Sequence, residues 1–158
     1  MKKINILRII LVILILCWMY MVFSFSAADG ETSSGLSLKV AEIFSNDEEV
    51  IEIIVPIIRK LAHLSEYALG GFLIFGLFST YNIDLKKQII FSGLFGIIYA
   101  ITDEIHQLFV DGRSSRIADV CIDTIGVLLG IFILLFIEEI VKRICNKNKK
   151  EEKEYAKF

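Results

Sequence analysis

The chain has 158 residues, of which 55% are hydrophobic and 23% are charged. Its mean hydropathy of +0.65 is higher than that of a typical soluble domain. Four apolar stretches approach or exceed the roughly 20 residues that a helix needs to cross a hydrocarbon core about 30 Å thick. The composition therefore argues against a single soluble domain and predicts an integral membrane protein.

The expected fold is all-α, a four-span transmembrane helical bundle. Its spans are predicted at about residues 9–28, 57–81, 89–109 and 117–137. They would form one domain over residues 1–145, followed by a charged tail over 146–158. The first span has an alternative interpretation as a cleaved signal peptide, because basic residues precede it and Ser26-Ala27-Ala28 resembles a cleavage site. Its apolar run is longer than an ordinary signal sequence, which favours the uncleaved span.

The longest loop, residues 29–55, is predicted to contain a short helix. Four of its apolar residues recur at helical spacing: Leu36, Val40, Ile43 and Phe44. This pattern suits either a helix on the membrane surface or one packed against the end of the bundle. Ser45-Asn46-Asp47-Glu48 has the pattern of a capping box, so the next helix should begin there. Pro56 should break or kink that helix, because its nitrogen cannot donate a hydrogen bond.

Basic residues are distributed unevenly between the two sides of these spans. With the N-terminus inside, twelve of the 17 Lys and Arg residues fall on the cytoplasmic side and the other five fall outside. The positive-inside rule therefore predicts that both termini are cytoplasmic. The acidic outer loop and the basic inner tail give no reason to expect nucleic-acid binding. The tail is expected to lie near anionic lipid or to extend into solvent.

The predicted topology brings polar residues of three spans to a similar depth near the outer face. Ionisable groups are costly in lipid unless they face a protein interior, pair with one another or serve a site. At about 100° per residue, most of these residues share one face of their helix, whereas Glu104 points elsewhere. Gly126-x-x-x-Gly130 would allow close helix approach just below this polar layer. The candidate ligand-binding residues are Lys60, His63, Glu66, Tyr67, Asp103, Glu104, His106, Gln107, Arg113, Arg116, Asp119 and Asp123.

Three interpretations of this polar layer stay open. The first is an internally neutralised network of ion pairs that fixes the register of the helices. The second is a metal site, because His63-x-x-Glu66 and Asp103-x-x-His106 each place two possible ligands on one helix face. The nearby basic residues would repel a cation, so we expect no metal and no other cofactor.

The third interpretation is recognition of an anionic or polar lipid headgroup. Lys60, Arg113 and Arg116 suit phosphate or carboxylate, which arginine can bind through two parallel hydrogen bonds. An enzyme is the less favoured class, because no nucleophile stands in a recognisable context. In a catalytic site the acid and base groups would be His63, Glu66, Asp103 and His106.

These residues fall in motifs that resemble those of the VanZ-like family of bacterial membrane proteins. The matching stretches are Lys60-x-x-His63-x-x-Glu66-Tyr67-x-x-Gly70, Tyr99-Ala100-x-x-Asp103-Glu104-x-His106-Gln107 and Arg113-x-x-x-x-x-Asp119-x-x-x-Asp123-x-x-Gly126. The resemblance covers most of the chain, from the second span through the fourth. It implies a small multi-pass protein of the bacterial cytoplasmic membrane.

The same resemblance implies a connection with glycopeptide resistance. The founding member of the family is associated with resistance chiefly to teicoplanin, without the usual change of cell-wall precursor. The expected partners are therefore membrane lipid and either a lipid-linked wall precursor or a glycopeptide antibiotic. The alternatives are an enzyme that acts on such a lipid or precursor and a small-solute or proton-coupled carrier.

Overall fold

The regular elements in the described part of the chain are all α-helices. A computed structural model describes residues 2–28, 30–113 and 116–155. Its helices are α1 (Lys2–Ala27), α2 (Gly30–Phe44), α3 (Glu48–Ser79), α4 (Leu85–Gln107) and α5 (Ile117–Tyr155). Four segments are long and apolar enough to cross a membrane: Asn5–Ala27, Glu48–Ser79, Leu85–Gln107 and Ile117–Lys149. The predicted all-α fold with four spans is confirmed.

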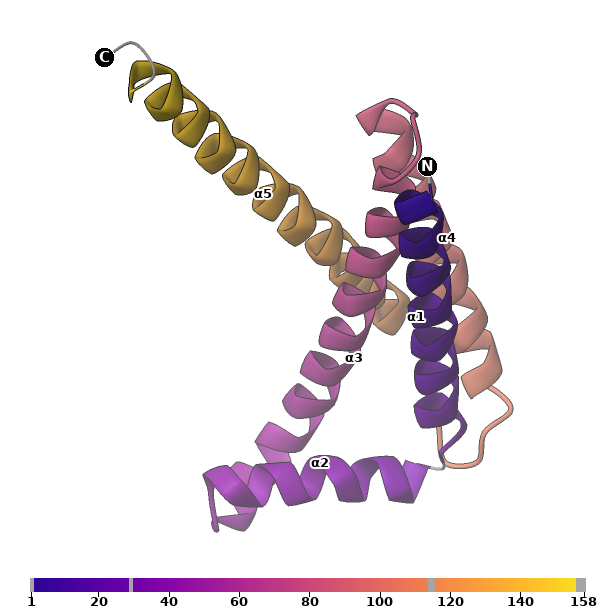
Figure 1. The fold of residues 1–158 in the computed structure, drawn as a ribbon. Coiled ribbons are helices and arrows are strands. Elements are labelled where there is room, and N and C mark those ends of the chain that lie inside the picture. Colours follow the sequence, from indigo (N-terminus) through magenta and orange to yellow (C-terminus); the bar gives the residue numbers. More distant parts are fainter. Residues whose placement is uncertain (1, 29, 114–115, 156–158) are drawn as a thin grey trace.

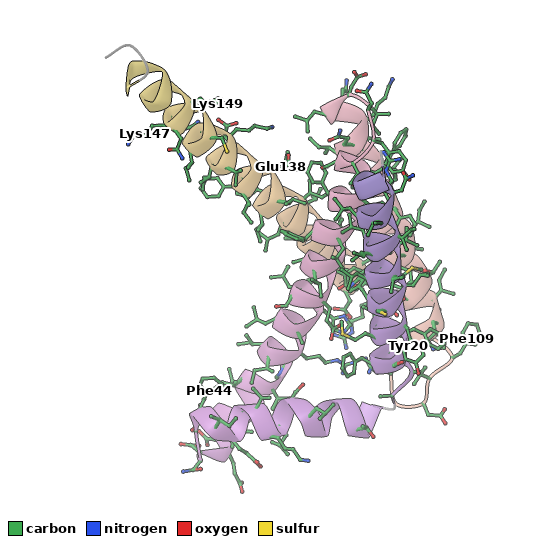
Figure 2. The ribbon with its side chains drawn as sticks, viewed as in Figure 1. Tyr20, Phe44, Phe109, Glu138, Lys147 and Lys149 are labelled. Carbon is green, nitrogen blue, oxygen red and sulfur yellow. The ribbon has the colours of Figure 1, made fainter. Side chains whose placement is uncertain are left out.

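The helices form an open bundle rather than four parallel rods. In Figure 1, α1 and α4 run side by side, α3 crosses α5 near the middle of the bundle, and α2 lies across the end where α1 finishes. Beyond the crossing, α5 diverges from the other helices. Figure 2 shows Lys147 and Lys149 on this diverging part. The charged tail predicted from residue 146 is therefore helical as far as Tyr155, continuous with the last span.

α2 confirms the helix predicted in the long loop, but it packs through a different face from the predicted apolar one. Ala41 is fully buried and Ser37 is nearly so, and α2 contacts α3. The predicted apolar residues stay exposed, with Ile43 79% and Phe44 72% accessible. Phe44 lies near the end of α2 that leads into α3 (Figure 2). An exposed apolar stripe beside a buried face of small residues suits a helix that touches protein on one side and lipid on another.

The cap at the start of α3 differs from the prediction. Asp47 is the N-cap, and its Oδ1 accepts a hydrogen bond of 3.0 Å from the Glu49 N–H. Ser45 Oγ instead accepts from the Asp47 N–H at 3.1 Å, so the predicted capping box is wrong in register because a nearer carboxylate takes the capping role. Pro56 lies inside α3 and does not break it. The proline removes one N–H donor, and hydrogen bonds on both sides continue the helix.

The crossing of α3 and α5 confirms the close approach predicted for the glycine pair of the last span. A Cβ added at Gly126 would lie 2.6 Å from the Leu64 carbonyl oxygen and 3.0 Å from Tyr67 Cβ. A Cβ at Gly130 would collide with the backbone of Ala68. Because glycine has no side chain, the two backbones can touch here, and this contact brings the polar residues one turn earlier on α5 up against α3.

An arginine of α1 fixes the end of α3 that lies away from α2. Arg8 Nε donates to Thr80 Oγ1 at 3.0 Å, and its Nη2 donates to the Thr80 carbonyl at 2.6 Å. The guanidinium carbon also lies 4.0 Å from the centre of the Tyr81 ring. Thr80 is the C-cap of α3, where backbone carbonyls lack intrahelical donors. Arg8 therefore supplies donors that this helix end needs.

Candidate functional site

A histidine and an aspartate from different helices meet at the α3–α5 contact. His63 Nδ1 lies 3.4 Å from Asp123 Oδ1. The Asp123 side chain is completely buried, and that of His63 is 17% exposed. A buried carboxylate is costly to desolvate unless a donor or a cation faces it, and His63 can be both. Gly126, one turn further along α5, allows the close helix approach that this pair needs.

A second buried carboxylate, Asp103, ties α4 to the end of α1. Ser26 Oγ donates to Asp103 Oδ2 at 2.9 Å. Gln107 Nε2 donates to the same carboxylate oxygen and to Ser26 Oγ, each at 3.3 Å. All three side chains are at most 4% exposed. The sequence interpretation missed Ser26, although it continues a helical stripe on α1 with the buried residues Trp18 and Val22.

Three aromatic residues pack together next to this polar layer. Trp18 meets Tyr67 edge-on, with ring centres 5.9 Å apart, and lies 5.0 Å from Tyr99. Trp18 Nε1 donates to the Glu66 carbonyl at 2.7 Å, and the Tyr99 hydroxyl donates to the Met19 carbonyl at 2.5 Å. These contacts fix α1 against α3 and α4. Tyr67, a predicted site residue, is fully buried in this group.

Two of the predicted charged residues serve the backbone of neighbouring helices. Arg113 Nε donates to the Ala28 carbonyl at 3.0 Å, and its Nη2 donates to the Phe25 carbonyl at 2.6 Å. Glu104 Oε2 accepts from the Arg116 N–H at 3.1 Å, where α5 is about to begin. Burial, and after it the positive charge of Arg59, lowers the pKa of Arg113. Arg113 thus caps the end of α1, and Glu104 holds the start of α5.

Two cavities open between the polar layer and α2. The larger, of about 330 Å³, is here called the cationic cavity; its polar wall residues are Ser34, Arg59, Lys60, His63, Gln107, Arg116 and Asp119. The smaller, of about 210 Å³, is here called the adjoining cavity; its polar wall residues are Ser26, Ser37, Arg59, His63, Glu66 and Arg113. Arg59 and His63 line both cavities, so the two spaces meet along one face of α3.

The predicted residues separate into three groups by position. Those on the cavity walls are Lys60, His63, Glu66, Gln107, Arg113, Arg116 and Asp119. Those buried behind the walls are Tyr67, Asp103 and Asp123. Glu104 and His106 make their contacts elsewhere: the His106 ring stacks on Phe23, with ring centres 4.5 Å apart. Among the described residues, His106 is not part of either cavity wall.

The sequence interpretation also missed Arg59 and the α2 serines. Arg59 precedes His63 by one helical turn, so the same spacing argument that selected His63 would have selected it. Ser34 and Ser37 belong to a loop whose apolar residues drew attention instead. Their placement depends on how α2 lies across the bundle, which no local pattern reveals.

Comparison of the sequence with models of known protein families identifies one family that the chain matches. A sequence model described as VanZ/LLP1 matches residues 11–138. The chain belongs to the VanZ-like family. The matched region contains every predicted site residue and both halves of the α3–α5 contact. No curated protein and no solved structure matches this VanZ-like chain.

Proposed function

We propose that this VanZ-like protein binds the anionic headgroup of a membrane lipid in the cationic cavity. The observation that carries the proposal is the wall of that cavity, where Arg59, Lys60 and Arg116 surround one space of about 330 Å³. The described residues provide no hydrogen bond or ion pair to these three side chains. Their donors are therefore available to phosphate or carboxylate oxygens.

The remaining wall residues suit an amphiphile rather than a free ion. Val55, Pro56 and Ile122 line the same cavity next to the basic residues. All three belong to membrane-spanning helices, so a ligand with an anionic head and an apolar tail can contact both kinds of wall at once. Asp119 also lines the cavity and can accept a hydrogen bond from a hydroxyl or amine of the headgroup. A lipid-linked cell-wall precursor has this combination of groups.

Lipid binding by the purified protein tests the proposal. We expect dioleoyl phosphatidic acid to bind and dioleoyl phosphatidylcholine to bind at least tenfold more weakly in detergent micelles. Each hydrogen bond to a charged group contributes about 1.5–3 kcal/mol, so the Arg59→Gln/Lys60→Gln variant should lose tenfold or more in affinity. The matched control is Lys86→Gln/Lys87→Gln, an adjacent basic pair at the start of α4. Equal losses in both variants would contradict a specific site.

In this role the protein contributes to tolerance of teicoplanin-type antibiotics by holding a lipid-linked precursor. Expression in a susceptible bacterium should raise the inhibitory concentration of teicoplanin, and the Arg59→Gln/Lys60→Gln variant should not. Unchanged tolerance with the wild-type chain would refute the resistance role and leave the lipid-binding proposal in place. The measurement is growth against a teicoplanin dilution series, with protein level in the membrane checked for each variant.

A further inference from the structure

We infer that His63 and Asp123 make the cationic cavity a hydrolytic centre for a lipid phosphate. In this inference His63 is the general base that activates water, and Asp123 is the residue that positions it. The inference rests on the proposed function, because the lipid phosphate must bind before it can react. It goes further by assigning an activity and a substrate class: phosphate monoesters and phosphoanhydrides at the end of a lipid.

The geometry of His63 supports the role of a base. Its Nδ1 is buried and lies 3.4 Å from the Asp123 carboxylate. A carboxylate in this position favours the tautomer with the proton on Nδ1, which leaves the lone pair on Nε2. The exposed 17% of the side chain forms part of the wall of both cavities. The histidine thus has Nδ1 buried beside Asp123 and also lines both cavities, where a ligand would bind.

His106, the other histidine of the bundle, packs against an aromatic side chain and lines neither cavity. His106 stacks on Phe23; one ring nitrogen of each histidine is buried without a hydrogen bond, but among the described residues only His63 has a carboxylate, that of Asp123, within 4 Å of it. Its ring faces an aromatic side chain, whereas the ring of His63 lies between a buried carboxylate and a cavity lined by basic residues. A histidine that served only to neutralise Asp123 would not need to border both cavities. The two residues therefore form a matched pair for experiments.

The reaction balances with water as the co-reactant. The oxygen of a water molecule forms a bond to phosphorus while His63 Nε2 takes one of its protons. The bond between phosphorus and the leaving oxygen breaks. In a diphosphate this is the bridging oxygen, which leaves on the lipid monophosphate, and in a monoester it is the lipid oxygen, which takes a proton from solvent and leaves as an alcohol. The imidazolium returns its proton to solvent. Arg59, Lys60 and Arg116 offset negative charge on the phosphoryl oxygens in the transition state.

Phosphate release from defined lipids tests the inference. Purified full-length protein is incubated in mixed micelles with dioleoyl phosphatidic acid, a monoester, and with a polyprenyl diphosphate, an anhydride. Wild-type protein should release inorganic phosphate from at least one of them. His63→Gln should lower the rate about 10²-fold or more, the usual contribution of a general base. His106→Gln is the matched control and should release phosphate at the wild-type rate.

Asp123→Asn separates positioning from a purely structural role. We expect it to lower kcat and to leave KM near the wild-type value, because the cavity walls keep their residues. His63→Ala provides a second test, since free imidazole should restore part of its phosphate release. Rescue by imidazole would not be seen if the loss came from misfolding.

Lipid binding measured on the same samples distinguishes failure of the inference from failure of the proposed function. Binding without phosphate release from either lipid overturns the hydrolytic role and leaves lipid recognition intact. Phosphate release that persists in His63→Gln also overturns it. If neither lipid binds to the wild-type protein, the proposed function fails and the inference fails with it.

Discussion

The two ends of the helix bundle both contain half-buried arginines, but among the described residues only the α2 end lines a polar cavity with several basic side chains. At the end away from α2, Arg8 donates to the end of α3, and the nearby cavity of about 540 Å³ has mainly apolar walls. At the α2 end, Arg113 similarly donates to the end of α1. Arg59, Lys60 and Arg116 instead line a cavity with their donors available.

This difference separates the arginines that satisfy helix ends from the cations that we propose bind a ligand. An arginine that donates to helix carbonyls satisfies groups the fold would otherwise leave unpaired. Arg59, Lys60 and Arg116 line a cavity that also contains Asp119, and no described residue gives their side chains a hydrogen bond or ion pair. Our proposal assigns these free donors to an anion that comes from outside the chain. Variants of both kinds of residue test this distinction.

The largest effect is expected from removing the partner of the buried carboxylate at the α2 end. His63→Leu should lower the free energy of unfolding by about 3–5 kcal/mol, because Asp123 then stays buried without its partner. The double variant His63→Leu/Asp123→Leu should recover most of this loss. Unfolding of the detergent-solubilised protein by heat or by SDS provides the measurement. A double variant no more stable than the single one would show that the pair does not act as a unit.

The two capping arginines should have similar effects on stability although they lie at opposite ends. Arg8→Gln and Arg113→Gln should each cost about 1.5–3 kcal/mol, since each removes hydrogen bonds from a charged donor to backbone carbonyls. Lipid binding should distinguish the two ends of the bundle. Arg8→Gln should leave the affinity for phosphatidic acid unchanged, because Arg8 lies away from the cationic cavity. A loss of affinity in that variant would contradict the assignment of the ligand to the α2 end.

The α3–α5 crossing should be more sensitive to an added methyl group than other glycine positions. Gly126→Ala should cost about 1–3 kcal/mol, because the new Cβ would meet the Leu64 carbonyl at 2.6 Å. Gly93→Ala is the matched control, since nothing lies within 4 Å of a Cβ there. It should be neutral or stabilising by up to about 1 kcal/mol, as expected for alanine in a helix. Thermal unfolding of both variants checks the contrast.

The smallest effect is expected on the exposed stripe of α2. Ile43→Gln should change stability by less than about 0.5 kcal/mol, because the side chain is 79% exposed. A Phe44→Trp variant tests where this stripe lies. Its fluorescence should be quenched by brominated lipids if α2 rests on the membrane surface, with the buried Trp18 as background. Quenching no greater than that of the wild-type protein would place the stripe in water.

Patterns along a single helix predicted much of this architecture. The length of each apolar run predicted the four spans. The spacing of Gly126 and Gly130 predicted a close helix approach, which the structure shows between α3 and α5. Lys60 and His63, which the spacing predicts on one helix face, both line the cationic cavity. Such features depend on residues a few positions apart on one helix, where spacing fixes geometry.

Contacts between a side chain and a distant backbone could not be predicted in the same way. Arg113 and Glu104 each meet a backbone group at a helix end, which their sequence context does not indicate, although Arg113 also lines the adjoining cavity. Every residue carries the same backbone groups, so the sequence does not mark which carbonyl or N–H lacks a partner. The capping role of Asp47 in place of Ser45 has the same origin.

The continuity of α5 has a mechanical consequence. From the crossing at Gly130 to Tyr155 the helix extends about 38 Å at ~1.5 Å per residue. The contact with α3 lies near one end of this rod, and the long remainder has few neighbours. A tilt of about 5° at the crossing would displace the far end by roughly 3 Å, given the same rise per residue. The continuous helix therefore has the geometry of a lever, in which a small rotation at the crossing would produce a larger displacement toward its far end.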